Sequence, residues 1–184
     1  MAALSTAAWV AHDLGMAVGV GGSLFGRTAL EPSVRNISNR EERGQVINDA
    51  WRKFGVIQLG SLAVMAATWF AGRLRLTGRE VSSSSRGLVV AKDVLVGASL
   101  ASSIGAAIFG SKLAAQSDNG GVSMDQHGDV AADSPSRLRR LGQLTDAFGL
   151  VNLIAGAGVI TVTTLLAMSA GKSTRWSVLS RILP

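Results

Sequence analysis

The sequence contains no cysteine, no tyrosine, only two histidines and only three prolines among its 184 residues. The absence of cysteine excludes disulfides, thiolate metal sites, iron–sulfur clusters and cysteine nucleophiles. Two histidines are too few for a histidine-rich metal site, so we expect no metal. Charged residues make up 16% of the chain, whereas a soluble domain carries roughly a quarter. The composition therefore argues against an ordinary cytosolic protein.

Four apolar stretches occupy much of the chain, at residues 3–26, 54–72, 88–110 and 148–171. About 20 helical residues are needed to cross a hydrocarbon core about 30 Å thick, and each stretch is about that long. Residues 55–71, 94–110 and 147–170 contain no ionisable side chain, whereas a helix of a soluble bundle carries a charged face. The pattern predicts an all-α integral membrane protein, a four-transmembrane-helix bundle.

The basic and aromatic residues predict how this bundle sits in the membrane. Trp9, Trp51, Trp69 and Trp176 lie near the ends of the apolar stretches, as is typical of the headgroup region. Lys and Arg are dense in the short segments 73–87 and 172–184. We therefore expect these segments and both termini to be cytoplasmic. The frequent use of Ala, Gly, Val and Arg suggests a bacterial plasma (inner) membrane. This arrangement accounts for the net charge of +6 through contact with the anionic lipid bilayer, without nucleic acid.

An internal similarity predicts how the helices are paired. Residues 16–26 and 100–110 both end in Phe-Gly, and the following apolar stretches both begin with Phe-Gly, at 54 and 148. The alternative is chance similarity between Ala/Gly-rich helices. A true repeat predicts two helix pairs related by a parallel pseudo-twofold axis along the membrane normal.

The resulting organisation is a single membrane domain, residues 1–184. It consists of a first helix pair (1–72) with an outer loop (27–50), a cytoplasmic loop (73–87), a second helix pair (88–171) with a mobile acidic loop (116–133), and a basic amphipathic tail (172–184).

Glycines inside the apolar stretches predict close helix packing, because small residues let backbones approach in lipid. The glycines in question are Gly15, Gly19, Gly22, Gly26, Gly97, Gly105 and Gly156. These contacts can form within one chain, in a homo-oligomer, or with other membrane proteins. The sequence leaves these possibilities open.

Ionisable residues inside the apolar stretches are the strongest functional candidates. An acid near the centre of a span costs on the order of 3 kcal/mol on insertion scales, so it normally has a partner or a function. Aligning the repeats places His12 and Asp13 within reach of Lys92 and Asp93, and we predict one polar cluster in the inner leaflet. The cluster is either a structural contact that fixes helix register or a proton or ion relay. A third possibility is a shifted first helix that places residues 12–13 at the headgroups.

Two amides form a second candidate pair, because Gln58 and Asn152 occupy matching positions in the second and fourth stretches. We expect an interhelical hydrogen bond between them, worth about 1 kcal/mol. A ligand site is the alternative interpretation.

Cofactor and catalytic motifs are scarce. His12 and Met16 share one helix face, as haem or copper(I) ligands would, but one intramembrane histidine per chain cannot supply two axial histidines unless chains dimerise. We expect no cofactor. The sequence has no phosphate-binding loop, nucleophile elbow, zinc-protease motif or dinucleotide fingerprint. We therefore expect no catalytic residues and no enzymatic activity.

The histidine-containing first stretch, its ending in Leu-Phe-Gly-Arg at 24–27, and the Phe-Gly start at 54–55 resemble small four-helix integral membrane proteins of families of unknown function. The resemblance implies the four-span architecture over the whole length and supplies no activity or site residues. The functional hypothesis is a non-catalytic accessory or assembly subunit of a larger membrane complex. The alternatives are a small transporter or ion- or proton-conducting protein that uses His12, Asp13 and Lys92, and a haem- or quinone-linked membrane redox anchor.

Overall fold

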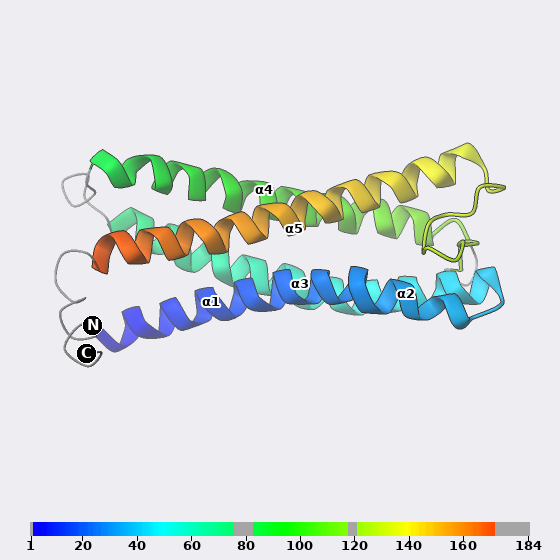
Figure 1. Ribbon diagram of the computed structural model, residues 1–184, viewed down its shortest axis with the longest axis horizontal. Coiled ribbons are helices and arrows are strands. Elements are labelled where there is room, and N and C mark those ends of the chain that lie inside the picture. Colours follow the sequence, from blue (N-terminus) through cyan, green and yellow to red (C-terminus); the bar gives the residue numbers. More distant parts are fainter. Residues whose placement is uncertain (1, 76–82, 118–120, 172–184) are drawn as a thin grey trace, which may run out of the picture.

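The computed structural model describes residues 2–75, 83–117 and 121–171, which fold into a helical bundle (Figure 1). Short helical turns connect the first long helix to the second, and no β-strand occurs in the described ranges, so the all-α prediction is confirmed. The long helices are α1 (Ala2–Phe25), α3 (Arg40–Arg75), α4 (Ser83–Ala114) and α5 (Ser136–Gly171). The connecting turns are η1 (Gly26–Leu30), α2 (Glu31–Ser33) and η2 (Val34–Asn36).

The helices form two hairpins that lie side by side. α1 packs mainly on α3, and α4 packs mainly on α5, with smaller contacts between α3 and α4 and between α1 and α5. Figure 1 shows α1 and α4 running away from the end where α1 begins, while α3 and α5 return to it. Paired helices are therefore present, whereas a repeat symmetry between the pairs stays a prediction.

Three of the long helices contain stretches that are long and apolar enough to cross a membrane, namely Arg40–Arg73, Arg86–Ala114 and Ser136–Met168. A helical bundle with membrane-spanning character is thus supported. α1 is not among these three in the described part of the chain. Its hydropathy is lowered by His12 and Asp13, the two ionisable residues near its middle.

α3 extends well beyond the apolar stretch predicted at 54–72. With 36 residues and a rise of 1.5 Å per residue, it is about 54 Å long, which exceeds the hydrocarbon core. Much of the predicted outer loop 27–50 is therefore helical. The helix begins after Asn39, whose Oδ1 accepts hydrogen bonds from the backbone N–H groups of Glu41 (2.8 Å) and Glu42 (3.2 Å). This side chain satisfies donors that the first turn leaves unpaired.

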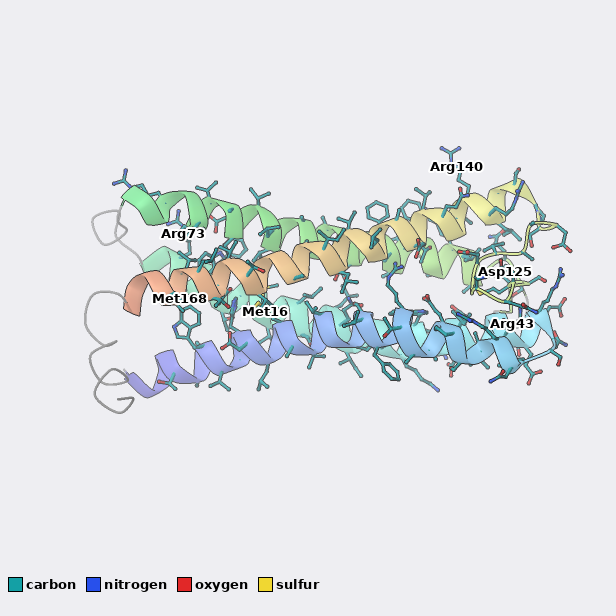
Figure 2. The ribbon with its side chains drawn as sticks, in the orientation of Figure 1. Met16, Arg43, Arg73, Asp125, Arg140 and Met168 are labelled. Atoms are coloured by element: carbon teal, nitrogen blue, oxygen red, sulfur yellow. The ribbon has the colours of Figure 1, made fainter. Side chains whose placement is uncertain are left out.

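The segment before α5 packs onto the start of α3. Arg43 is buried and donates hydrogen bonds to the backbone carbonyls of Met124 (2.9 Å) and Ile37 (2.7 Å). Figure 2 shows Arg43 and Asp125 at this end of the bundle. The described part of the acidic loop 116–133 is thus held against the helices, while its mobility stays a prediction.

Two buried apolar clusters stabilise the bundle at different levels. One joins the four long helices in the half nearer the start of α1 and includes Met16, Leu62, Met65, Val96 and Val159. The other joins α3, α4 and the segment before α5 and includes Val34, Ile47, Leu113, Val122 and Met124. Polar groups and open space lie between and beside these clusters.

Most of the predicted packing glycines lie where a Cβ atom would meet a neighbouring helix. In six cases the neighbour is identified: Gly15 faces Ser61 and Met65, Gly19 faces Leu62, Gly22 faces Phe54, Gly26 faces Trp51, Gly105 faces Phe148 and Gly156 faces Val20. Gly97 differs, because a Cβ there would meet nothing within 4 Å. At Gly15 the nearest atom is the backbone oxygen of Ser61, whereas at the other five glycines a side chain of the neighbouring helix packs on the glycine.

Candidate functional site

His12 of α1 and Lys92 of α4 meet inside the bundle. The Nζ of Lys92 lies 3.0 Å from Nε2 of His12, and the two residues are 0% and 2% exposed, respectively. The turns of α3 that face His12 belong to the stretch 55–71 without ionisable residues. A buried polar contact therefore forms at the level of this apolar stretch, between two residues that are 80 positions apart.

The neighbours of His12 determine its tautomer. Nδ1 lies 3.0 Å from the backbone carbonyl of Met65 and 3.3 Å from Oγ1 of Thr68. A carbonyl can only accept, so Nδ1 carries the hydrogen, and Nε2 accepts from the Lys92 ammonium. Both ring nitrogens of His12 therefore have partners within the chain.

Aromatic rings complete the surroundings of Lys92. Its Nζ lies 4.1 Å from the ring centroid of Trp69 and 5.6 Å from that of Trp9. A cation over an indole face is attracted by the ring quadrupole, with an energy of about 2 kcal/mol when water is excluded. The imidazole nitrogen and the two indoles together replace part of the hydration that the ammonium loses on burial.

Asp93 lies beside this contact, whereas Asp13 points away from it. Trp69 Nε1 donates to Oδ1 of Asp93 (2.8 Å), and Arg73 Nε lies 3.5 Å from Oδ2; Figure 2 shows Arg73 in this half of the bundle. Asp13 is exposed, and its charge acts on Lys92 and His12, but no hydrogen bond or ion pair joins its carboxylate to another described residue. Successive helical residues point about 100° apart, so a helix that directs His12 inward directs Asp13 outward.

The sequence analysis missed the residues that α3 contributes. Thr68 contacts His12, Trp69 covers Lys92, and Arg73 pairs with Asp93; all three lie at the end of the apolar stretch 54–72 or directly after it. The available signal was the spacing of Trp69 and Arg73, which are four residues apart and hence on one helix face.

The two predicted amides are hydrogen-bonded to each other. Gln58 Nε2 donates to Asn152 Oδ1 (3.2 Å) and to Ser23 Oγ (2.9 Å). Asn152 Nδ2 donates to the backbone carbonyl of Ser99 (2.8 Å). Because these residues come from α3, α5, α1 and α4, this amide network connects all four long helices near the middle of the bundle.

A cavity of about 810 Å³ lies between the two hairpins. It is on the opposite side of the amide network from His12. Gln58 and Asn152 line it at one level, and residues 127–130 of the segment before α5 line it at another. Ligand pockets commonly have volumes of about 300–1,000 Å³ and lie between the helices of bundles. The bundle therefore combines a closely packed half with a half that contains a ligand-sized space.

Charged residues line the outer part of this cavity. Arg27 forms an ion pair with Asp146 (2.8 Å) and also donates to the Asp146 backbone carbonyl (2.9 Å). Glu31 lies nearby, and burial raises the pKa of its carboxyl group above the ordinary value of 4.5, opposed by the positive charge of Arg27 and a hydrogen bond with Trp51. Burial therefore favours the neutral form of Glu31.

This raised pKa predicts a pH-dependent contribution to stability. The folded state retains the Glu31 proton to higher pH than the unfolded state, so this contribution is complete below pH 4.5 and is lost as the pH rises through the folded-state pKa. We expect Glu31→Gln to have a higher thermal unfolding midpoint than the wild type at pH 8, with the difference shrinking towards pH 4. The control is Glu42→Gln, at an exposed carboxylate. A Glu31→Gln difference that is independent of pH would contradict the prediction.

The geometry thus presents three features for functional interpretation: an enclosed His12–Lys92 contact, an outward-facing acid at Asp13, and a large cavity beyond the amide network. Comparison with protein-family models, with curated proteins and with solved structures finds no match for this chain.

Proposed function

We propose that the chain is an integral membrane protein that crosses the bilayer four times and acts, without catalysis, as an accessory or assembly subunit of a larger membrane complex. α1 supplies the fourth crossing. Its 24 residues are about 36 Å long, enough to cross the hydrocarbon core. The free-energy cost of placing the His12 imidazole in the membrane is reduced by its hydrogen-bond partners on α3 and α4.

The observation that carries this proposal is the position of Asp13. Its neighbour His12 packs against Met65 and Thr68, which places Asp13 at the depth of the apolar stretch 55–71. Asp13 is nevertheless exposed on the bundle surface; the charge of Lys92 acts on it at longer range, but it has no hydrogen bond or ion pair with the described residues. An intramembrane carboxylate costs on the order of 3 kcal/mol unless it is partnered. A Lys or Arg on a transmembrane helix of another protein would offset this cost.

The surface beside Asp13 suits such a helix. A shallow groove runs between α1 and α3, and all of its lining side chains except Ser61 are apolar or absent. Leu14 and Ile57 are exposed there, and a Cβ at Gly60 would meet nothing within 4 Å. Small residues permit close helix approach in lipid, so the acid and the groove together support a helical partner.

Loss of a partner on Asp13→Asn tests this proposal. Affinity purification in mild detergent, followed by mass spectrometry, is expected to recover a membrane protein with the wild type and at least five-fold less of it with Asp13→Asn. Glu42→Gln, an exposed carboxylate outside the apolar stretches, is the control. If the recovered protein contacts Asp13, changing its Lys or Arg to Asp should restore binding to Asp13→Lys. Equal recovery with Asp13→Asn would overturn the proposal.

The proposal includes the orientation and location expected from the sequence. The protein lies in a bacterial plasma membrane, with both termini and residues 73–87 on the cytoplasmic side. The two hairpins are repeats related by a parallel pseudo-twofold axis along the membrane normal. The common direction of α1 and α4 in Figure 1 supports this arrangement, because parallel repeats enter the membrane from the same side.

A second candidate function is proton or ion conduction, which the buried contact between Lys92 and His12 favours. Ionisable residues in membranes mark ion and proton pathways. This function predicts that Lys92→Met lowers proton flux in proteoliposomes containing the purified protein. The accessory role predicts no flux above that of empty liposomes for either the wild type or Lys92→Met.

A further inference from the structure

The innermost part of the cavity carries uncharged hydrogen-bonding groups that lack partners. Ser103 lines the cavity and is 5% exposed, and its hydroxyl has no hydrogen bond with another described residue. Gln58 Nε2 donates hydrogen bonds to Ser23 and Asn152, whereas Gln58 Oε1 accepts none from the described residues. Neither oxygen is fully enclosed by protein, so both are open to the cavity and can be satisfied by an occupant or water. This level of the cavity therefore presents a hydroxyl and a carbonyl oxygen to an occupant.

The walls outward from this level are apolar and made of small residues. Val56 and Leu59 of α3 line one side, and Ala107 and Gly110 of α4 line another. A Cβ at Gly55 would meet nothing within 4 Å, so the cavity is wide there. From Ser103 to Ser111 the helical rise gives a depth of about 12 Å. An occupant thus needs an apolar body about as long as this depth.

The charges beside the cavity lie at its outer part. Arg27 pairs with Asp146 there, burial favours the neutral form of Glu31, and Arg52, Asp129 and Arg139 also line this outer part. Neither Ser103, Gln58 nor Asn152 carries a charge. An ionic headgroup next to them would be desolvated without a counter-charge, whereas an uncharged polar group would be hydrogen-bonded.

We infer that this cavity binds an uncharged amphipathic molecule, with a hydroxyl or carbonyl group at Ser103 and Gln58 and an apolar body along α3 and α4. The inference is independent of the proposed partner at Asp13, which lies on the outer surface of α1. It extends the role of the bundle from a structural subunit to a receptor for a small membrane-soluble molecule.

Quenching of Trp51 tests the inference, because Trp51 lines the cavity and bromine quenches indole fluorescence on contact. The full chain in nanodiscs is titrated with 11-bromoundecanol, 11-bromoundecanoate and 11-bromoundecyl-trimethylammonium. These probes share one chain length and differ in head charge. The Trp51 signal is the difference between the wild type and Trp51→Phe. We expect saturable quenching of this signal by the alcohol at concentrations at least ten-fold lower than for either ion.

Matched glycine variants separate cavity binding from quenching by bulk lipid. Gly55→Leu fills the cavity, while Gly97→Leu makes the same change at a position that is also open but does not line it. We expect the saturable alcohol signal to be lost in the first variant and kept in the second. Ser103→Ala removes one hydroxyl and keeps the cavity; we expect about five-fold weaker alcohol binding, the effect of one hydrogen bond of about 1 kcal/mol.

The inference is overturned by equal quenching with the three probes, by a signal that Gly55→Leu leaves unchanged, or by unchanged alcohol affinity in Ser103→Ala. If Gly55→Leu does not fold, Ser103→Ala decides the outcome alone. These measurements use the purified chain without a partner, so their failure leaves the Asp13 experiment unaffected.

Discussion

Replacing His12 by leucine is expected to destabilise the bundle by about 3 kcal/mol, the scale of breaking a buried charged contact by removing one partner. His12 provides the nitrogen that accepts from Lys92 at 3.0 Å. Without it the Lys92 ammonium stays buried beside two indole faces, with no hydrogen-bond acceptor for its side chain among the described residues. A buried cation that has lost its acceptor is the costly outcome, since water cannot replace the imidazole in a close-packed interior.

Lys92→Met is expected to cost less, about 1–2 kcal/mol, because it leaves a neutral ring nitrogen unpaired rather than a charge. The double variant His12→Leu/Lys92→Met removes both polar groups. We expect its stability to lie within about 1 kcal/mol of the wild type, since apolar replacement of a buried polar pair is often neutral. The two single effects are therefore strongly non-additive, as is usual for residues in direct contact.

The free energies of unfolding can be measured by titration with SDS in mixed micelles, followed by circular dichroism. If the losses of stability in His12→Leu and Lys92→Met simply add in the double variant, the contact does not form as described. Ser111→Ala is the control, because Ser111 is exposed and its hydroxyl bonds only within its own helix.

Gly15→Leu is expected to destabilise the α1–α3 hairpin by about 2 kcal/mol, the typical cost of overpacking a well-packed site. A Cβ at Gly15 would lie 2.6 Å from the backbone oxygen of Ser61 and 3.2 Å from Cβ of Met65. Neither atom is at the end of a flexible side chain, so the helices themselves must separate. Separation would also weaken the hydrogen bond from His12 to the Met65 carbonyl.

Gly21→Leu is the matched control, since it makes the same change on the same helix at a position where a Cβ meets nothing within 4 Å. Its effect is expected to lie within about 0.5 kcal/mol. The same SDS titration compares the two variants. Equal effects would mean that the loss reflects added bulk or hydrophobicity in α1 rather than the approach of α1 to α3.

The contact between His12 and Lys92 could be predicted because ionisable residues are rare inside the apolar stretches. With so few candidates, pairing His12 with Lys92 required only that their levels along the helices agree. The same reasoning joined Gln58 to Asn152, which lie 3.2 Å apart. It did not foresee that Asp13 is exposed and hydrogen-bonds to none of the described residues, because the direction of one side chain depends on the rotation of its helix.

The part contributed by α3 was not predictable in the same way. Trp69 was interpreted as a headgroup residue, yet its indole covers Lys92 and donates to Asp93. A tryptophan near the end of a span suits both an interface and a helix contact. The choice between them is made by neighbouring helices that are distant in the sequence.

By itself the sequence determined the all-α class, the apolar helices and the pairs of polar residues at matching depths, because helix length and hydropathy follow from local composition. Only the tertiary structure decided which face of each helix turns inward, and hence that His12 is enclosed while Asp13 faces outward. It also decided that small residues of α3 and α4 face each other across a cavity of about 810 Å³. The volume of this cavity depends on the distance between the two hairpins, and no local pattern of residues encodes that distance.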